Sequence, residues 1–385
     1  DVLGSRGLGD VYKRQFQYAV PPETFFEGVY CLLPGHYLWY RDGKVETTRY
    51  WEARFNPDES LTEEQAVDEI EKVFEESVNA HKISDVEVGC FLSSGVDSSY
   101  VSTYFADQKT FTVGFDFGEK YNEISWAERL SKKIGVEHHT HLISSEEFWG
   151  NVEHVQYHMD QPLADPSCIA LYFVSKLASE YVKVVLSGEG ADEIFGGYNV
   201  YSEPGGSAYD KLPRGLRRGI GHIAEKMPAH RGRNFLVRKG KDLEERFIGN
   251  AYMFTPEERK ALLKIRTNAP DPMAITKPFY DKVQDQDDVT KMQYLDLHMW
   301  MAGDILLKAD KMSMANSLEL RVPFLDKKVM ELAEQIPTRY RVTREAVTDE
   351  KTPYITKYAM RLAAKKDTPP QTAKTAAKKK LGFPV

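Results

Sequence analysis

The chain has 385 residues, a hydrophobic content of 42% and a formal net charge of −7 at pH 7. That length allows two domains of roughly 150 to 200 residues each, with enough apolar side chains for their cores. The negative charge argues against nucleic acid as a partner, because phosphate binding needs clustered Lys and Arg. No apolar run approaches the ~18 residues that a membrane span needs. These features favour a soluble enzyme that binds neither nucleic acid nor a membrane.

The cysteines are isolated and odd in number, without Cys-x-x-Cys spacing. They are Cys31, Cys90 and Cys168. Unpaired thiols are typical of a reducing compartment. We therefore expect a cytoplasmic protein.

The first 15 residues have neither helical nor strand periodicity. They look like translated adapter sequence, and we exclude them from fold reasoning. Residues 16–55 hold short aromatic strands with a hairpin turn at Asp42 and Gly43. An amphipathic helix then covers 62–80 and begins with the capping pattern Thr62 to Gln65.

Strands and helices alternate between residues 86 and 187. The predicted strands are 86–92, 109–116, 137–143 and 182–187, and the predicted helices are 98–106, 122–135, 146–159 and 167–181. Such alternation predicts a parallel sheet, with ligands at the carboxyl ends of its strands. Beyond about residue 200 helical periodicity dominates, with its longest run over 288–317. Residues 201–240 are rich in Gly, Pro and Arg and predict a loosely ordered insertion.

The hydroxyl-rich turn 93–99 is the most informative segment, because it lies between a predicted strand and a predicted helix. The N–H groups and dipole of a helix N-terminus favour an anion, and the hydroxyls add donors. Asp97 would repel a phosphate there unless a divalent cation such as Mg2+ lay between them. The turn is not a Walker loop, since no Gly-Lys-Ser/Thr closes it. It predicts a phosphate site; the alternative is an ordinary Ser-capped helix.

A second candidate segment places Glu189, Asp192 and Glu193 directly after the predicted strand 182–187. Acids in such a position need a cation, an ammonium group or a proton to compensate them. The alternative is a solvated acidic loop that caps a helix. Since both segments follow strands of one parallel sheet, we expect them at the same edge.

Four segments in order resemble the ATP pyrophosphatases and, more closely, the synthetase domain of glutamine-dependent asparagine synthetases. Segment 93–99 resembles the Ser-Gly-Gly-x-Asp-Ser signature, with Ser94 in place of the first Gly. Segment 188–198 reads Gly-Glu-Gly-Ala-Asp-Glu-Ile-Phe-Gly-Gly-Tyr, segment 318–326 follows 304–308 at the family's spacing, and 380–385 is the fourth. The resemblance covers 16–385. It implies an α/β fold with a parallel-sheet ATP-pyrophosphatase core, followed by a mainly helical region.

The resemblance also predicts the domain organisation. Residues 16–55 look like the segment that joins a glutaminase domain to the synthetase, 56–200 like the α/β core, and 201–385 like the mainly helical part. Such enzymes begin with a glutaminase domain whose N-terminal Cys liberates ammonia, and nothing in this sequence corresponds to it. We therefore expect an internal fragment that stops where the family continues into further helices.

Site residues follow from matching the family's motifs residue by residue. The implied ATP- and pyrophosphate-binding residues are Leu92, Ser93, Ser94, Gly95, Val96, Asp97, Ser98, Ser99, Val113, Gly114 and Gly188. Mg2+ would bridge Asp97, Asp192 and the phosphates. The implied substrate-binding residues are Asp160, Asp304 and Asp192, the first two for the α-amino group of aspartate.

The implied reaction joins ATP, aspartate and ammonia. The side-chain carboxylate of aspartate attacks the α phosphorus, which gives aspartyl-AMP and pyrophosphate, and ammonia then displaces AMP. Lys380 would neutralise charge in the first step, and Glu189 would receive a proton from the attacking nitrogen. Nitrogen comes from glutamine in the intact family enzymes and would come from ammonia here. The resemblance also allows a homodimer for the intact enzyme.

Two alternatives remain open. A related amide-forming enzyme such as a β-lactam synthetase shares the scaffold, but it places a Tyr–Glu pair where asparagine synthetases use the Glu that this chain keeps as Glu189. The second alternative is a fragment that binds ATP without turnover. Loss of helices that would support Lys380 favours it.

Overall fold

One parallel sheet lies at the centre of the fold. The computed structural model describes residues 16–105, 108–116, 122–203, 208–228, 230–251, 253–254, 258, 261–262, 271–343 and 355–366. Its strands are β5 (Glu137–Ile143), β4 (Lys109–Phe115), β3 (Val88–Phe91), β6 (Val184–Leu186) and β7 (Glu319–Arg321), in this spatial order. All four neighbouring pairs are parallel. The predicted α/β class with a parallel sheet is therefore confirmed.

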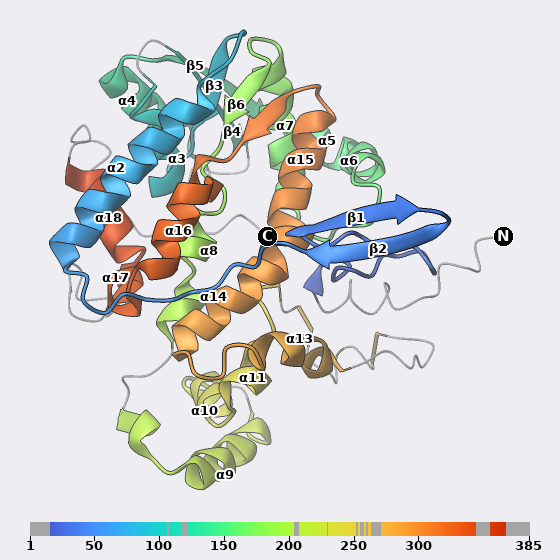
Figure 1. Ribbon diagram of the computed structural model, residues 1–385, viewed down its shortest axis with the longest axis vertical. Coiled ribbons are helices and arrows are strands. Elements are labelled where there is room, and N and C mark those ends of the chain that lie inside the picture. Colours follow the sequence, from blue (N-terminus) through green and yellow to red (C-terminus); the bar gives the residue numbers. More distant parts are fainter. Residues whose placement is uncertain are drawn as a thin grey trace.

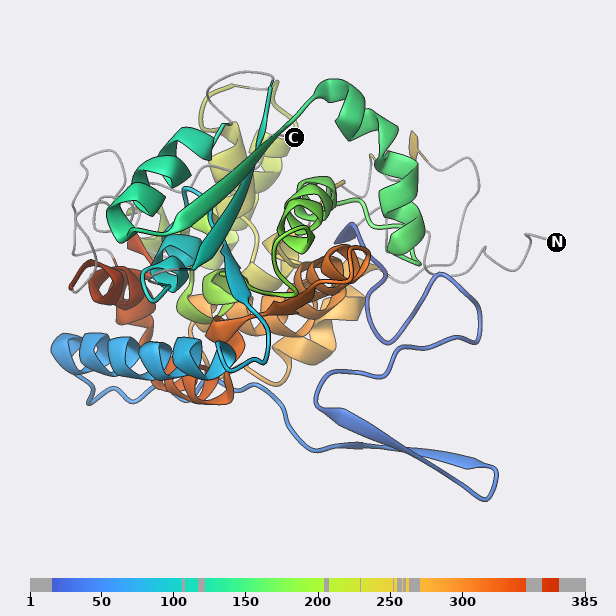
Figure 2. The ribbon, with the colours of Figure 1, turned by 90° about the horizontal axis from the view of Figure 1, so that it is seen from above.

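Helices cover the two faces of the sheet (Figures 1 and 2). The helices in the part of the molecule around the sheet are α2 (Glu63–His81), α3 (Val96–Ser102), α4 (Ile124–Ile134), α5 (Ser145–Gly150), α6 (Val152–His158), α7 (Ser167–Ser179), α8 (Ala191–Phe195), α15 (Leu306–Met314), α16 (Lys327–Gln335) and α18 (Tyr358–Lys366). The others are α9 (Arg214–Glu225), α10 (Arg233–Lys239), α11 (Leu243–Arg246), α13 (Pro272–Tyr280), α14 (Asp288–His298) and α17 (Thr338–Arg341). The structure also has the 3-10 turns η3 (Asn199–Ser202), η4 (Ala208–Lys211) and η6 (Pro323–Leu325), the π-helical turn η5 (Met301–Ile305), and the two-residue strands β8 (Val342–Thr343) and β9 (Ile355–Thr356).

The sheet separates two hydrophobic cores. Side chains alternate along a strand, so Cys90 and Phe91 of β3 enter opposite cores. Cys90 packs with apolar residues of α2, α3, α16 and α18, whereas Phe91 packs with Val174 of α7 and Leu318. Because both faces are covered, the ends of the strands are what the sheet leaves open to a ligand.

The local sequence signals predicted most of the elements between residues 62 and 187. The helix predicted over 62–80 is α2, and its capping box is present: Gln65 N donates to Thr62 Oγ1 at 3.2 Å, and Thr62 N donates to Gln65 Oε1 at 2.9 Å. Strand 137–143 is β5 with the same bounds. The helix predicted over 146–159 is divided at Asn151 into α5 and α6. The strand β7 was not predicted, because three residues are too few to show periodicity.

The prediction of one continuous helical run over 288–317 is wrong. The segment consists of α14, the π-helical turn η5 and α15. At the end of the turn Leu306 N donates to Met301 O, five residues earlier, where an α-helix would use the residue four back. A widened turn shifts the helical face by one residue, which a hydrophobic pattern read at 3.6 residues per turn does not reveal.

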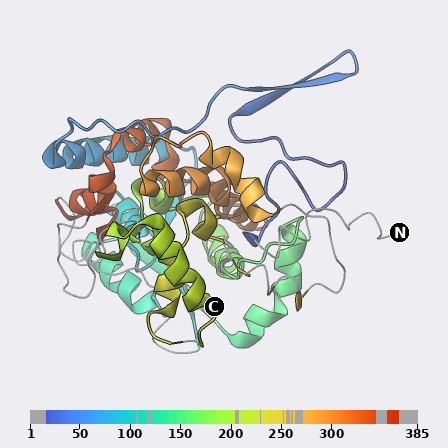
Figure 3. The same cartoon turned by 90° about the horizontal axis from the view of Figure 1, so that it is seen from below.

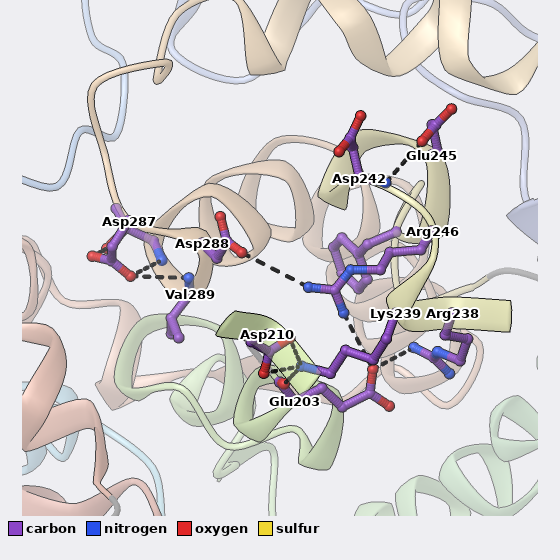
Figure 4. A network of polar contacts seen from close by, with 12 residues as sticks. Glu203, Asp210, Arg238, Lys239, Asp242, Glu245, Arg246, Asp287, Asp288 and Val289 are labelled. Atoms are coloured by element: carbon purple, nitrogen blue, oxygen red, sulfur yellow. Dashed lines mark hydrogen bonds and ion pairs between the residues drawn. The ribbon is translucent and has the colours of Figure 1, made fainter. Parts of the chain in front are cut away.

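Residues 201–240 were predicted to be loosely ordered, and their described part is instead held by ion pairs (Figure 4). Lys239 of α10 is 8% exposed, and its Nζ donates to both Asp210 carboxylate oxygens at 3.0 Å and to Glu203 O at 2.9 Å. Arg238 and Arg246 reach the Glu203 carboxylate at 2.7 and 3.6 Å. Charge pairing therefore supplies the order that composition did not indicate.

The predicted hairpin is confirmed and extends away from the body of the molecule (Figure 3). Strands β1 (His36–Arg41) and β2 (Lys44–Arg49) pair antiparallel about Asp42 and Gly43, which both have positive φ. Trp39 and Tyr40 are 65% and 70% exposed. Among the described helices, none has the length and apolar character to cross a membrane.

Candidate active site

The two candidate loops lie side by side because their strands are neighbours. Cys90 of β3 pairs with Leu186 of β6, and each strand leads directly into its loop. A Cβ on Gly188 would lie 2.8 Å from Ser98 N and 2.9 Å from Asp97 Cβ. The loops therefore touch at Gly188, where a side chain would force them apart. The sequence expectation that both loops share one sheet edge agrees with this arrangement.

Hydroxyl groups fix the shape of the Ser-rich turn. Ser98 Oγ accepts from Ser93 N at 3.0 Å and lies 2.8 Å from Ser93 Oγ. Ser93 Oγ accepts in turn from Gly95 N at 3.0 Å, and Ser99 Oγ donates to Gly95 O at 2.7 Å. These bonds order the turn before any ligand binds, so that its remaining donors are arranged in advance.

Ser94, where the signature has Gly, bonds to the loop after β4. Its Oγ donates to Glu123 Oε1 at 2.7 Å, and its N donates to Glu123 Oε2 at 3.3 Å. The carboxylate of Glu123 thus lies against the turn. Glu123 was not among the predicted site residues, because nothing in the local sequence links it to Ser94.

Lys357 is the principal site residue that sequence reasoning missed. Its Nζ lies 2.6 and 2.7 Å from the two carboxylate oxygens of Asp97 and 2.7 Å from Asp192 Oδ1. The residue is 1% exposed and has φ +53°, just before α18. Arg361 lies one helical turn further along the chain. Burial lowers the pKa of its guanidinium group, and the charges of Asp97 and Asp192 oppose that effect. The two predicted metal ligands therefore converge on one buried ammonium group.

The arrangement fits a Mg2+ ion held jointly with a nucleotide. Mg2+ in nucleotide sites takes one or two carboxylates and completes its shell with phosphate oxygens and water. Asp97 and Asp192 supply two such carboxylates beside the Ser-rich turn. Among the described residues no group of three or more His, Cys, Asp or Glu side chains could hold a metal by themselves. An ion at this position would thus need the phosphates as ligands and would share the carboxylates with Lys357.

The acidic loop contains a carboxyl group whose pKa is raised by burial. Glu193 is 1% exposed; burial, with the nearby charge of Asp192, raises its pKa to about 7. Tyr198 Oη donates to Glu193 Oε1 at 2.5 Å, and Gln293 Nε2 donates to Glu193 O at 2.6 Å. Glu189 is only partly buried and lies at the entrance of the same loop. Glu193 therefore anchors the loop, whereas Glu189 keeps partial exposure to solvent.

A second group of charges surrounds Asp304 in the π-helical turn. Asp304 is fully buried, and its nearest cation is Lys308, with Nζ 3.5 Å from Oδ1. Lys308 Nζ lies closer to Asp165, at 2.5 Å from Oδ2. Burial raises the pKa of Asp304 to about 8, whereas at Asp165 the effect of burial is outweighed by Lys308, which lowers the pKa. One ammonium group thus serves two buried carboxyl groups and compensates the charge of Asp304 only in part.

The other predicted residues have different surroundings. The Asp160 side chain is 70% exposed and pairs with Lys311, so it lies outside the buried cluster of Asp304. Leu92 is buried at the end of β3, and Gly114 lies on the adjacent β4, where a Cβ would be 2.7 Å from Asn122 Oδ1. Lys380 and the rest of 380–385 lie outside the described residues.

Comparison with known proteins identifies the family. The family model described as "Asparagine synthase" matches residues 69–385. The chain belongs to the asparagine synthase family. It is 42% identical over 377 residues to asparagine synthetase [glutamine-hydrolyzing] 1 of Bacillus subtilis (strain 168), covering 96% of this chain and 57% of that protein. A putative asparagine synthetase [glutamine-hydrolyzing] of Mycobacterium bovis is 39% identical over 379 residues, covering 96% of this chain and 56% of the relative.

The chain thus spans somewhat more than half the length of these curated relatives. A solved structure, the U34-tRNA thiolase NcsA from Methanococcus maripaludis with its [4Fe-4S] cluster, matches with a TM-score of 0.29 and 13% identity. The match covers 64% of this chain and 80% of that one. Likeness at that level carries no argument about function.

Proposed function

We propose that this chain catalyses the ATP-dependent amidation of aspartate to asparagine through a β-aspartyl-AMP intermediate. The observation that carries the proposal is the convergence of Asp97 and Asp192 on Lys357, next to the Ser-rich turn. Family membership agrees with it. The buried charges provide what a polyphosphate requires, namely a fixed cation and two carboxylates that can hold a metal ion.

ATP would lie along the ends of β3 and β4. Its adenine would contact Leu92, Val113 and Gly114, and its β and γ phosphates would lie in the turn 93–99. Lys357 is held in place on both sides by carboxylates, so its ammonium group is preorganised and needs little reorganisation when charge develops nearby. Mg2+ bound by Asp97 and Asp192 would supply further neutralisation of the phosphates.

Aspartate would bind beside the ATP site with its α-ammonium group at Asp304. The carboxyl group of Asp304 is fully buried with an incomplete set of counter-charges, and it therefore must hold either a proton or a cation. A substrate ammonium group meets that requirement. Asp160, which was expected to help, lies in an exposed position and is the weaker candidate.

Two displacements would complete the reaction. An oxygen of the substrate's side-chain carboxylate forms a bond to the α phosphorus, and the bond to pyrophosphate breaks. Ammonia then forms a bond to the acyl carbon, and AMP leaves with the electron pair of the broken C–O bond. The proton released by the attacking nitrogen passes to a base, for which Glu189 is the candidate because it is partly exposed in the acidic loop. Lys380 remains a candidate for charge neutralisation in the first step.

The nitrogen source is a further part of the proposal. The curated relatives are named as glutamine-hydrolysing. The exposed aromatic side chains of the β1–β2 hairpin, including Trp39 and Tyr40, fit a surface that a glutaminase domain covers. For the chain as given we propose ammonia as the nitrogen donor and a cytoplasmic location.

An aspartate-dependent exchange of pyrophosphate into ATP, followed by asparagine formation with ammonium salt, tests the proposal. We expect exchange with aspartate alone and asparagine only when ammonium is added. Glutamine should not replace ammonium for this chain. Exchange with other carboxylic acids but not with aspartate would favour a related amide-forming enzyme, and ATP binding without any exchange would favour an inactive ATP-binding module.

A further inference from the structure

The turn that carries Asp304 is unusual in the fold. Residues 301–305 form a single π-helical turn between α14 and α15. π turns are rare and occur mostly as single turns inside α-helices, frequently at functional sites. Asp304 is fully buried in this turn, with Lys308 its nearest cation. The direction of its carboxyl group therefore depends on what holds the turn.

Tyr18 packs directly onto the turn from a distant part of the chain. A Cβ on Gly303 would overlap Cδ2 and Cε2 of the Tyr18 ring, so the ring lies against the Gly303 backbone. Tyr18 is 1% exposed and its ring lies 6.0 Å from that of Trp300. Burial raises the pKa of Tyr18, and the charges of Asp296 and Asp304 add to the effect. The side chain thus contacts the turn and lies within the electrostatic reach of Asp304.

The segment around Tyr18 is firmly anchored. Phe16 and Val20 are 0% and 3% exposed in the same core, and Ala164 N donates to Gln17 O at 2.9 Å. Residues 16–20 lie outside the part of the chain that the family model matches. An ordered segment N-terminal to that domain therefore forms one wall of the Asp304 region.

We propose that Tyr18 is a positioning residue: its ring holds the π-helical turn over Gly303 so that the carboxyl group of Asp304 faces the amino-acid substrate. The role of Asp304 in binding aspartate rests on the proposed function, whereas the hold on the turn does not. Gly303 and Tyr18 form a size-matched pair, since the ring occupies the space that a side chain at 303 would take.

Amide hydrogen exchange of the 385-residue chain tests the hold on the turn. We expect Tyr18→Ala to speed the exchange of the 303–305 amides about tenfold or more while exchange in α2 stays unchanged, because the loss is a local opening. Tyr280→Ala is the matched control: Tyr280 is also 1% exposed in the same core, and its hydroxyl donates to Phe247 O. Should Tyr18→Ala not fold, Tyr18→Leu removes the flat ring with a smaller loss of volume.

Kinetic measurements with aspartate test the positioning of Asp304. In aspartate-dependent ATP–pyrophosphate exchange, Tyr18→Ala should raise the KM for aspartate about fivefold or more and leave the KM for ATP within about twofold, because binding energy is lost at one subsite. Gly303→Ala should act in the same way. The double variant should be no worse than either single variant, because the added methyl group fills the space that the ring vacates.

The outcomes separate the two proposals. Unchanged protection of 303–305 in Tyr18→Ala, or the same increase in Tyr280→Ala, overturns the positioning role. So does an equal rise in KM for ATP and aspartate. A wild-type chain without aspartate-dependent exchange would contradict the proposed function, while the hydrogen-exchange result would still decide whether Tyr18 holds the turn.

Discussion

Lys357 Nζ lies 2.6 Å from Asp97 Oδ1, although the two residues are 260 positions apart in the chain. The ion pair links the Ser-rich turn after β3, which carries Asp97, to the start of α18, which follows Lys357. Asp192 completes the group at 2.7 Å. This buried ion triplet joins three distant segments at the ends of the strands, so it couples the packing of the domain to the charge of the candidate site.

Replacing the ammonium group should affect both stability and activity. In Lys357→Met two largely buried carboxylates lose their shared counter-ion, which costs roughly 3 to 5 kcal/mol for a broken buried pair. We also expect aspartate-dependent exchange to fall on the order of 10²-fold or more, as for the loss of one preorganised donor. Urea unfolding and exchange rates measure the two effects.

Lys366→Met is the matched control for that substitution. Lys366 lies at the other end of α18, its side chain is 48% exposed, and it pairs with Asp68 at the surface. Its loss should leave exchange within about twofold of wild type, since exposed ion pairs contribute little. Wild-type exchange in Lys357→Met would mean that the triplet is structural only.

Asp97→Asn should abolish adenylation and the Mg2+ dependence of ATP binding. The amide keeps the size of the side chain but removes its charge, and its NH2 group cannot accept from Lys357. Both Asp97 oxygens accept from Lys357, so a loss of stability of about 1 to 3 kcal/mol should accompany the change. Calorimetric titration with ATP, with and without Mg2+, gives the result. Asp68→Asn, at an exposed position, should change neither quantity.

Asp304 should give the free energy of unfolding a distinct pH dependence. Its pKa is raised to about 8 by burial, with Asp165 adding to the effect and Lys308 opposing it, whereas the pKa of an unfolded Asp is about 3.9. The folded chain then binds the extra proton, so this group makes the free energy of unfolding fall as pH rises from about 4 to about 8. Asp304→Asn should remove that contribution, which urea unfolding at several pH values measures.

The same shift should be visible in substrate affinity. If the ammonium group of aspartate binds ionised Asp304, the KM for aspartate should decrease as the pH rises toward about 8. Near that pH a larger fraction of Asp304 is already ionised before the substrate binds. Asp304→Asn should raise that KM at least about tenfold, equivalent to 1.4 kcal/mol, and flatten its pH profile. A profile with the wild-type slope in Asp304→Asn would assign the titration to another group.

The sequence predicted those features of the fold and site that depend on short spacings. The cap of α2, strand β5 and the two loops after β3 and β6 each depend on residues within a dozen positions of one another. Periodicity and turn chemistry act over that range. The family motifs extended this reach by assigning roles to Asp97, Asp192 and Asp304, roles that remain predictions.

Other features depend on contacts between distant segments and have no local signature. Lys357 stands between Thr356 and Tyr358 with nothing to distinguish it from a surface lysine until the fold brings it to Asp97. The same role, binding of the α-amino group of aspartate, was predicted for Asp160 and Asp304. Packing places Asp160 at the surface and buries Asp304. The π turn at Gly303 likewise depends on Tyr18, some 285 residues earlier in the sequence.

The region of α9 and α10 offers a test of whether ion pairs order it. Lys239 is 8% exposed and donates to Asp210 and to Glu203 O, which fixes α10 against the preceding segment (Figure 4). Lys239→Met leaves the Asp210 carboxylate without this partner, and a lost charged hydrogen bond costs about 2 kcal/mol. We therefore expect faster proteolytic cleavage within 208–246 and a lower unfolding midpoint.

Lys241→Met is the comparison, because Lys241 is two residues away and pairs with Glu225 in a 44% exposed position. Its replacement should leave the cleavage rate unchanged, since solvent already screens that pair. Because the region is remote from the Ser-rich turn, Lys239→Met should also keep the KM for ATP within about twofold at a temperature where the chain is folded. Cleavage of Lys239→Met at the wild-type rate would show that apolar packing between α9 and α10, where Gly221 and Gly240 meet at their Cα atoms, orders the region instead.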